Sequence, residues 1–314
     1  MAAALALSQR SVGRTGINPP VGCIIVNQGH IVGRGWTQNG GRPHAEAMAL
    51  AQAGEAACGA IVYVTLEPCA HKSERGTACV AALLAAKPAR IVVAAQDPDP
   101  RTNGKGAALL REAGIEVETG LMEEEARAVM AGFFTRIEKK HPFVTLKLAT
   151  SLDGKIALAD GSSRWITGEA ARAHCHLERA RHEAILVGAG TVRADNPKLD
   201  VRLAGLEKRS PERIMLGSGD PPDGWQAIFS PQEISQLDCN HLFVEGGAQT
   251  AASFLKAGLV DRLLLYRAPI LIGDGKACLG DIGLEQLGGA HGQWALADAR
   301  MLGKDRMEVY TKQE

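Results

Sequence analysis

The stretch Pro43-His44-Ala45-Glu46, followed by Glu67-Pro68-Cys69 and by Cys79, is the most informative part of this chain. A histidine and two cysteines suit the tetrahedral nitrogen and sulfur coordination of zinc, and three protein ligands leave a fourth position open to water. A glutamate two residues after the histidine can carry protons beside a metal without binding it. The pattern predicts a catalytic zinc site at His44, Cys69 and Cys79. Glu46 is its expected acid–base catalyst.

The elements around these motifs alternate between strands and helices. Apolar runs at 21–26 and 31–36, joined by Asn27-Gln28-Gly29-His30, predict a hairpin. Further strands are expected at 60–66, 90–95 and 115–117, and helices at 45–52, 79–86 and 106–113. The alternation predicts an α/β layer fold. Both ligand segments fall near helix N-termini, where the helix dipole favours a thiolate.

The alternation starts again after a helix predicted over 121–140, which ends at His141-Pro142. The domain boundary is therefore placed near Lys140, which gives domains of residues 1–140 and 141–314. In the second domain, strands are expected at 143–149, 185–187, 213–216, 227–229, 241–244 and 262–266, and helices at 169–183 and 250–257. The segment 204–238 is rich in proline, glycine and charge.

The composition is that of a globular protein of two domains. The chain has 314 residues, of which 46% are hydrophobic and 22% charged. Lys+Arg and Asp+Glu both number 35, so the net charge is zero. A nucleic-acid-binding protein usually carries a basic excess, so nucleic acid is not an expected partner. Neutral charge, together with Glu46, also argues against a non-catalytic zinc module that binds nucleic acid.

Cysteine usage and hydropathy bear on the cellular compartment. The seven cysteines are odd in number and irregularly spaced. They argue against a disulfide framework and favour a reducing cytoplasm with thiolate metal ligands. The apolar segment 1–7 has no basic residue before it and predicts a helix, not a secretion signal. Because no run of about 18 apolar residues occurs, no membrane association is expected.

Three segments of the first half carry a resemblance to a known family. They are Asn18-Pro19-Pro20-Val21-Gly22, His44-Ala45-Glu46 and Thr65-Leu66-Glu67-Pro68-Cys69-Ala70-His71. They resemble the deaminase half of the bifunctional riboflavin-biosynthesis deaminase–reductases. The resemblance implies a cytidine-deaminase-like three-layer domain, with Asn18 in contact with the pyrimidine. Nine residues separate Cys69 from Cys79, one more than is usual in the family, so His71 is an alternative third ligand.

Two glycine-rich turns in the second half are candidates for a phosphate or dinucleotide site. Gly188-Ala189-Gly190-Thr191 follows a predicted strand, but a third glycine and a suitable βαβ unit are missing, which argues against a Rossmann site. Glu245-Gly246-Gly247-Ala248 lies between a predicted strand and a predicted helix. Its glycines would let backbone N–H groups approach an anion at the helix N-terminus, although the pattern alone also fits a plain turn.

The second half resembles the reductase half of the same family in the segments 146–154, 163–168, 188–197 and 260–269. The resemblance implies a dihydrofolate-reductase-like α/β domain that uses NADPH. The cofactor contacts that it implies are Ala149, Trp165, Thr191, Asp195, Gly246 and Gly247. The substrate contacts that it implies are Ser163, Arg179, Leu199, Arg202 and Glu245.

The reductase chemistry accounts for several of these residue types. The ribose must open to an imine or its equivalent before hydride reaches its first carbon, and Lys147 is the candidate catalytic cation that polarises this centre or relays a proton. Arg179 and Arg202 suit the ribose phosphate because guanidinium groups match oxyanions. Without the resemblance, each arginine would fit a solvated surface charge equally well, and Trp165 would fit a core position.

The motifs together span residues 18–269 and predict a bifunctional enzyme of riboflavin synthesis with Zn²⁺ and NADPH as cofactors. The first domain would hydrolytically deaminate 2,5-diamino-6-(5-phosphoribosylamino)pyrimidin-4-one. The second would reduce the ribosyl group of 5-amino-6-(5-phosphoribosylamino)uracil to ribityl. Because 204–238 is shorter than usual in the family, the alternative is an active deaminase with a weak or inactive reductase domain. The expected partner is this small-molecule substrate, and assembly as a homo-oligomer is left open.

Overall fold

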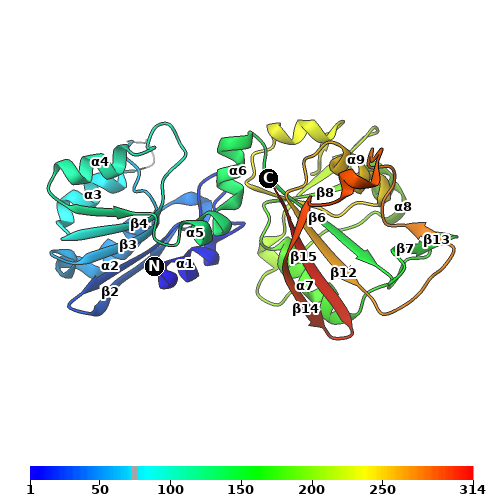
Figure 1. The fold of residues 1–314 in the computed structure, drawn as a ribbon, viewed down its shortest axis with the longest axis horizontal. Coiled ribbons are helices and arrows are strands. Elements are labelled where there is room, and N and C mark those ends of the chain that lie inside the picture. The colour runs from blue at the N-terminus through cyan, green and yellow to red at the C-terminus, as the bar shows by residue number, and fades with distance from the viewer. Residues whose placement is uncertain (72–75, 314) are drawn as a thin grey trace. The chain divides into compact units, whose positions relative to one another are not determined.

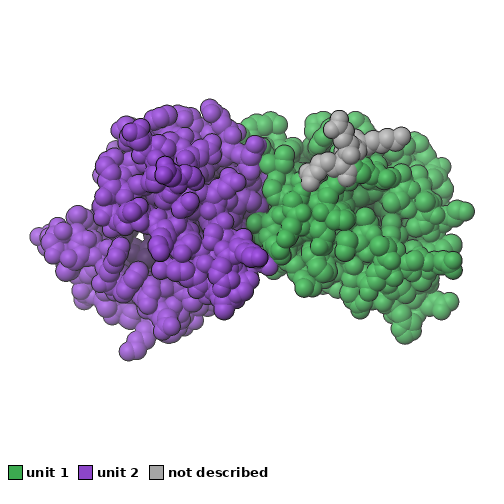
Figure 2. All heavy atoms as spheres, turned by 180° about the vertical axis from the view of Figure 1, so that it is seen from behind, with its two compact units in different colours: residues 1–140 green, residues 141–314 purple. Residues whose placement is uncertain are grey.

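The computed structural model describes residues 1–71 and 76–313 and divides into two compact units, residues 1–140 and 141–314 (Figure 2). Each unit has a hydrophobic core of its own. In each, apolar strands form the centre of a sheet and helices pack on it (Figure 1). No helix in the described ranges is both long and apolar enough to cross a membrane.

A five-stranded sheet with the order β2-β1-β3-β4-β5 forms the centre of the first unit (Figure 1). Strand β1 pairs antiparallel with β2 and β3, whereas β3, β4 and β5 are parallel. The predicted hairpin is confirmed, and Gln28 and Gly29 in its turn have φ of 48° and 78°, as a two-residue hairpin turn requires. The strands are β1 Gly22–Asn27, β2 His30–Trp36, β3 Ile61–Leu66, β4 Arg90–Ala95 and β5 Glu116–Thr119.

Glycines in the first hairpin let helices approach both faces of this sheet. A Cβ atom on Gly22 would lie 1.9 Å from the carbonyl oxygen of Ala4 in α1 (Ala2–Ser8), and one on Gly35 would lie 1.9 Å from that of Ala45 in α2 (Ala45–Ala53). Gly35 pairs with the neighbour of Gly22, so the two helices lie on opposite faces. Helix α2 contacts α3 (Cys79–Ala86), which contacts α4 (Lys105–Glu112), and α1 contacts α5 (Glu123–Val129). The unit therefore has three layers.

The single helix predicted over 121–140 is wrong, because the structure has two helices there, α5 and α6 (Ala131–Lys139). Met130 forms the joint with φ −98° and ψ 18°. Its side chain is fully buried in the same core as Phe133 and Phe134. The break thus serves packing, and the nearby Gly132 is the one residue in the sequence that could have signalled it.

An eight-stranded sheet with the order β10-β9-β8-β11-β6-β12-β15-β14 forms the centre of the second unit. The strands from β10 to β12 are parallel to one another, and β15 and β14 add antiparallel pairs. The six predicted strands are confirmed as β6 Phe143–Thr150, β8 Ala184–Gly188, β9 Glu212–Leu216, β10 Gln226–Ile228, β11 His241–Val244 and β12 Arg262–Arg267. The hairpin of β14 Trp294–Leu302 and β15 Asp305–Lys312 was not predicted.

Three helices accompany the parallel strands: α7 (Glu169–Arg179), α8 (Ala189–Asp195) and α9 (Ala248–Lys256). Helix α7 is shorter than the predicted 169–183. The His182 ring turns inward and its Nδ1 lies 2.7 Å from the Glu178 carbonyl oxygen, which ends the helix early. A separate two-stranded sheet joins β7 (Lys155–Leu158) to β13 (Gly275–Ala277). Because the parallel strands share a direction, their carboxyl ends meet at one edge of the sheet.

Candidate active sites

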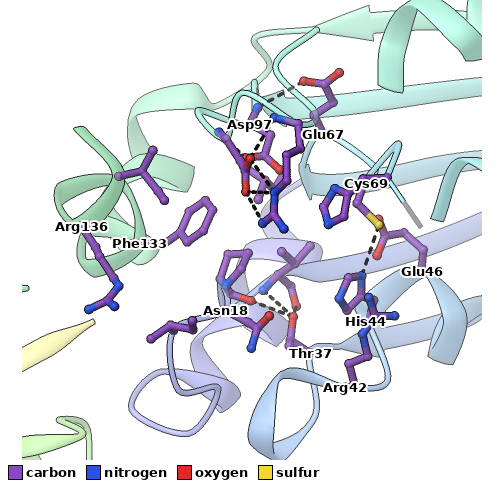
Figure 3. Close-up of a pocket in the computed structure, with 18 residues that line it drawn as sticks. Asn18, Thr37, Arg42, His44, Glu46, Glu67, Cys69, Asp97, Phe133 and Arg136 are labelled. Atoms are coloured by element: carbon purple, nitrogen blue, oxygen red, sulfur yellow. Dashed lines mark hydrogen bonds and ion pairs between the residues drawn. The ribbon is translucent and has the colours of Figure 1, made fainter. Parts of the chain in front are cut away.

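The three predicted metal ligands of the first unit lie together (Figure 3). The donor atoms of His44, Cys69 and Cys79 are all within 4.8 Å of one another. The Nδ1 of His44 is 3.1 Å from the Cys79 sulfur and 3.7 Å from the Cys69 sulfur, which Figure 3 shows directed at the His44 ring. His44 precedes α2, Cys69 follows β3, and Cys79 is the first residue of α3. One nitrogen and two sulfur donors at this spacing suit zinc with an open fourth position.

Helix geometry and hydrogen bonds favour a thiolate at this cluster. The backbone N–H of Cys79 donates to the Cys69 sulfur at 3.3 Å. Hydrogen bonds from the Cys79 thiol and from His44 outweigh burial and lower the pKa of Cys69 to about 4. The pKa of the Cys79 thiol is raised in turn, because it keeps the proton that the two sulfurs share. The pair therefore presents one ready anionic ligand.

Glu46 lies beside this cluster without belonging to it. The residue is in the first turn of α2, is 3% exposed, and lines the same cavity as His44 and Cys69 (Figure 3). Burial raises the pKa of its carboxyl group, while the charge of His44 lowers it. A carboxyl group with a raised pKa holds a proton more readily than a free one, so it can both accept and return a proton during a reaction. This is the placement that a proton carrier needs.

The alternative ligand His71 has a different partner. Its Nδ1 lies 3.3 Å from the Thr102 hydroxyl. Among the residues that the structure describes, the cluster with metal-binding spacing consists of His44, Cys69 and Cys79 and does not include His71. His71 does line the same cavity. The longer segment between the two cysteines therefore still brings Cys79 to the cluster.

The cavity next to the cluster has a volume of about 170 Å³ and is lined by residues from both halves of the first unit. Asn18 lines it, and Gly41 leaves room for its side chain, because a Cβ on Gly41 would lie 2.1 Å from the Asn18 amide nitrogen. Phe133 and Arg136 of α6 lie on the side away from His44 (Figure 3). The predicted pyrimidine contact and the cluster thus share one space.

Three carboxylates that line the cavity, Glu67, Asp97 and Asp99, were given no role by the sequence analysis. Glu67 accepts hydrogen bonds from the backbone N–H groups of Gly104, at 2.9 Å, and Ala107, at 3.0 Å. Burial, with the nearby charges of Asp99 and Glu67, raises the pKa of Asp97 to about 7. Glu67 and Asp97 follow the adjacent parallel strands β3 and β4. Their position after neighbouring parallel strands is the signal that could have identified them.

In the second unit, three predicted residues from separate elements form an ion cluster. Glu245 follows β11 and lies 3.2 Å from Lys147 Nζ of β6 and 2.8 Å from an Arg179 nitrogen of α7. The three side chains are between 10 and 17% exposed. Burial opposes ionisation of Glu245 most strongly, yet the charges of Lys147 and Arg179 lower its pKa to about 2. Two cations and one anion leave the cluster with a net positive charge.

The Gly246-Gly247 turn is closely packed. Together with Gly188, it lies at the edge of the sheet where the parallel strands end. A Cβ on Gly246 would lie 2.5 Å from the Thr250 side chain, and one on Gly188 would lie 2.4 Å from the Thr250 hydroxyl. The Thr191 hydroxyl lies 4.0 Å from the position of a Gly247 Cβ. The turn at Gly188 and the turn at Gly246-Gly247 therefore both lie against Thr250 in the first turn of α9. Backbone N–H groups at the start of a helix are the groups that bind an anion.

The other predicted residues of the second unit are spread around the edge of the sheet at which the parallel strands end. Trp165 is 66% exposed, so it is no core residue, and the Arg172 guanidinium lies 4.8 Å from its ring centre. Ser163 is also exposed. A long ion pair of 3.9 Å connects Arg164 to Asp195. Ala149 lies near the carboxyl end of β6.

Leu199 and Arg202 lie on one short segment after α8. Leu199 is 6% exposed, whereas the Arg202 side chain is exposed. Between them, the Asp200 carbonyl accepts a hydrogen bond of 3.0 Å from Arg179. This contact brings the segment to the ion cluster.

Both units match known families. The model of the cytidine and deoxycytidylate deaminase zinc-binding region matches residues 1–95. The model of the RibD C-terminal domain matches residues 142–224 and 232–307. The second match covers both sides of the short 204–238 segment, so the alternative of an inactive reductase domain is not favoured.

Similar proteins cover nearly the whole chain. The riboflavin biosynthesis protein RibD of Aquifex aeolicus is 40% identical over 91% of this chain and 90% of its own length, and that of Escherichia coli is 39% identical over 97% and 96%. The Acinetobacter baumannii RibD structure superposes with a TM-score of 0.91 at 35% identity, covering 100% of this chain and 98% of its own.

A Thermotoga maritima diaminohydroxyphosphoribosylaminopyrimidine deaminase/5-amino-6-(5-phosphoribosylamino)uracil reductase superposes with a TM-score of 0.88 at 30% identity, covering 100% of this chain and 97% of its own. These matches confirm the expected fold class, a cytidine-deaminase-like domain followed by a dihydrofolate-reductase-like domain. The chain belongs to the RibD family of bifunctional riboflavin-biosynthesis deaminase–reductases.

Proposed function

We propose that the first unit is a zinc-dependent deaminase of 2,5-diamino-6-(5-phosphoribosylamino)pyrimidin-4-one and that the second reduces the ribosyl group of the deaminated product with NADPH. The observation that carries the proposal is the cavity that His44 and Cys69 of the metal-binding cluster share with Glu46 and Asn18. An open-site ligand set beside a buried carboxyl group and an amide fits hydrolysis of a planar amidine-like ring.

In the first unit, the donor set of His44, Cys69 and Cys79 fits zinc. Zinc, when bound, lowers the pKa of a water molecule and so supplies a nucleophile at neutral pH. Glu46 would move a proton from the attacking water to the ring nitrogen and then to the departing amine. Asn18 would orient the pyrimidine through its side-chain amide. Burial of Glu46 would limit exchange of this proton with bulk solvent.

In the second unit, the glycine turns around Thr250 and the exposed Trp165 fit a dinucleotide along the carboxyl edge of the sheet. NADPH, when bound, supplies a hydride. Lys147, held in its ammonium form by Glu245, would polarise the opened ribose or give it a proton. Arg179 would attract the ribose phosphate, supported by the net positive charge of the ion cluster and by Arg202.

The remaining expectations concern the enzyme's surroundings. All seven cysteines are free in the structure, which suits a reducing cytoplasm. The partner that we propose is the small-molecule phosphoribosyl pyrimidine substrate. We propose no binding to nucleic acid or to a membrane.

One assay of both half-reactions tests this function. Purified protein is given the diamino substrate, and ammonia release and NADPH oxidation are followed together. We expect one ammonia and one NADPH per substrate consumed. A chain that releases ammonia but neither oxidises nor binds NADPH would instead support a deaminase with an inactive second domain. A chain that releases no ammonia after zinc reconstitution would refute the first assignment.

A further inference from the structure

The segment 199–202 carries two expected substrate residues on an unusual backbone. Leu199 has φ of +53°, in the left-handed region that leucine rarely adopts. Such a conformation costs energy and persists only where surrounding contacts hold it. The contacts of this segment therefore determine where Leu199 and Arg202 stand.

Hydrogen bonds from three directions hold the segment. The Val201 N–H donates to the Ser210 hydroxyl at 3.0 Å. The Asp200 carbonyl accepts from Arg179 at 3.0 Å and also lies 3.1 Å from His176 Nδ1. Two of the three directions thus come from helix α7.

One ring nitrogen of His176 reaches two groups of the segment. With a proton on Nδ1 it donates to the Asp200 carbonyl oxygen at 3.1 Å, and in the other tautomer it accepts from the Arg202 backbone N–H at 3.4 Å. His176 and Arg179 are three residues apart on α7, so they share a face of that helix. The His176 ring therefore holds the peptide that leads into Arg202. The ring itself lies next to Arg179 on α7.

His176 suits a holding role better than the other contacts do. Arg179 also pairs with Glu245 and is expected to meet the substrate phosphate. Burial, followed by the charges of Arg179 and Arg202, lowers the pKa of His176, so the ring is neutral at physiological pH. A neutral ring adds no charge of its own and can hold the segment without competing for the phosphate.

We propose that His176 is a positioning residue of the second unit, which fixes 199–202 against α7 so that Arg202 stands ready beside Arg179 for the substrate phosphate. The proposal rests on the reductase function proposed above and deepens it. A preset pair of arginines spares the substrate the entropy of ordering the segment, so the effect falls on substrate affinity.

A pair of variants separates the hydrogen bond from the bulk of the ring. His176→Leu keeps the volume and loses the polar contact, whereas His176→Asn places an amide atom near Nδ1 that can donate or accept. We expect the KM for the deaminated intermediate to rise about tenfold in the leucine variant, the scale of one lost hydrogen bond. The asparagine variant should recover most of this. The KM for NADPH, kcat and ammonia release should stay within about twofold of the wild type.

Leu177→Ala is the matched control, because Leu177 is the exposed neighbour on α7. An unchanged KM in the leucine variant, an asparagine variant as poor as leucine, or an equal rise in both KM values would overturn the proposal. Hydrogen exchange gives a readout that needs no reductase activity: the amides of Val201 and Arg202 should exchange faster in His176→Leu alone. If the amides of Val201 and Arg202 exchange at the same rate in His176→Leu, the positioning role of His176 is refuted. A wild type that cannot use NADPH refutes only the reductase function.

Discussion

The two sites treat buried charge in opposite ways. The first gathers two thiols and the carboxyl groups of Glu46 and Asp97 near His44, and the carboxyl groups are almost fully buried. The second places the Glu245 carboxylate between the cations Lys147 and Arg179. Buried acidic groups cost several kcal/mol unless cations offset them. In the first site, His44 acts on Glu46 and Arg101 on Asp97, but both carboxyl groups still have raised pKa values, so the offset is only partial. The first unit is therefore expected to depend on a bound cation for activity and stability, and the second is not.

Loss of the metal should produce the largest effect, confined to the first unit. Cys79→Ser should lower the zinc content from about one equivalent per chain to near zero and abolish ammonia release. The reason is that the cluster then offers only two of its three donors. Elemental analysis and an ammonia assay measure both, and NADPH oxidation with supplied intermediate should persist.

His71→Ala is the control for that experiment. Because His71 bonds to Thr102 and lies outside the cluster, this variant should keep its zinc. Zinc lost in His71→Ala but retained in Cys79→Ser would show that the third ligand had been misassigned.

Glu46→Gln should lose about 10³-fold in deamination and keep its zinc, because the amide fills the same space but carries no proton. The variant separates chemistry from metal binding within one site. Turnover near the wild-type rate would remove Glu46 from the mechanism. The second unit serves as the internal control, since its reduction rate should not change.

The first site could be predicted almost whole from sequence, because its groups sit in short motifs at element boundaries. His44 and Glu46 are two residues apart, and Cys79 opens a helix whose predicted bounds of 79–86 are those observed. Asp97 escaped notice and Glu67 was quoted only as part of the Cys69 motif, because a carboxylate after a strand has no distinctive spacing. Their role depends on which strands are neighbours in the sheet.

In the second site, the glycine turn at 245–248 could be picked out from its pattern, but the other residues could be assigned only through resemblance to a family. Lys147, Arg179 and Glu245 come from three elements spread over about a hundred residues, and no local pattern connects them. Their meeting depends on the parallel order of β6, β8 and β11. The break at Met130 and the early end of α7 were missed for a similar reason, since buried side chains cause both.

Lys147→Met tests the second site, where two cations flank one carboxylate. The variant keeps the bulk of the side chain and leaves Glu245 paired with Arg179, so the unit should remain folded. We expect reduction to fall about 10²-fold, less than the Glu46 effect because Arg179 still provides positive charge. NADPH oxidation is followed with supplied intermediate, and Lys208→Met, at an exposed lysine, is the matched control. Equal losses in the two variants would argue against a specific role for Lys147.

The smallest effect is a pH dependence of stability in the second unit. His182 is buried, with Nδ1 at the Glu178 carbonyl and Nε2 3.1 Å from the Thr145 hydroxyl. Burial lowers its pKa to about 4, against about 6.5 in the unfolded chain. Below pH 6.5 the unfolded state takes up the proton and the folded state does not, so stability is lost as pH falls towards 4.

Between pH 6.5 and 5.5 the free energy of unfolding should fall by about 1 kcal/mol from this group. Three of the four tryptophans, Trp165, Trp225 and Trp294, lie in the second unit, so fluorescence of a Trp36→Phe chain reports its urea unfolding alone. Adding His182→Gln should lower the pH slope by about one proton. The other histidines keep the slope from vanishing, because His174 and His176 also have lowered pKa values. A slope that is identical with and without His182 would show that this ring takes up its proton in the folded unit as readily as in the unfolded one.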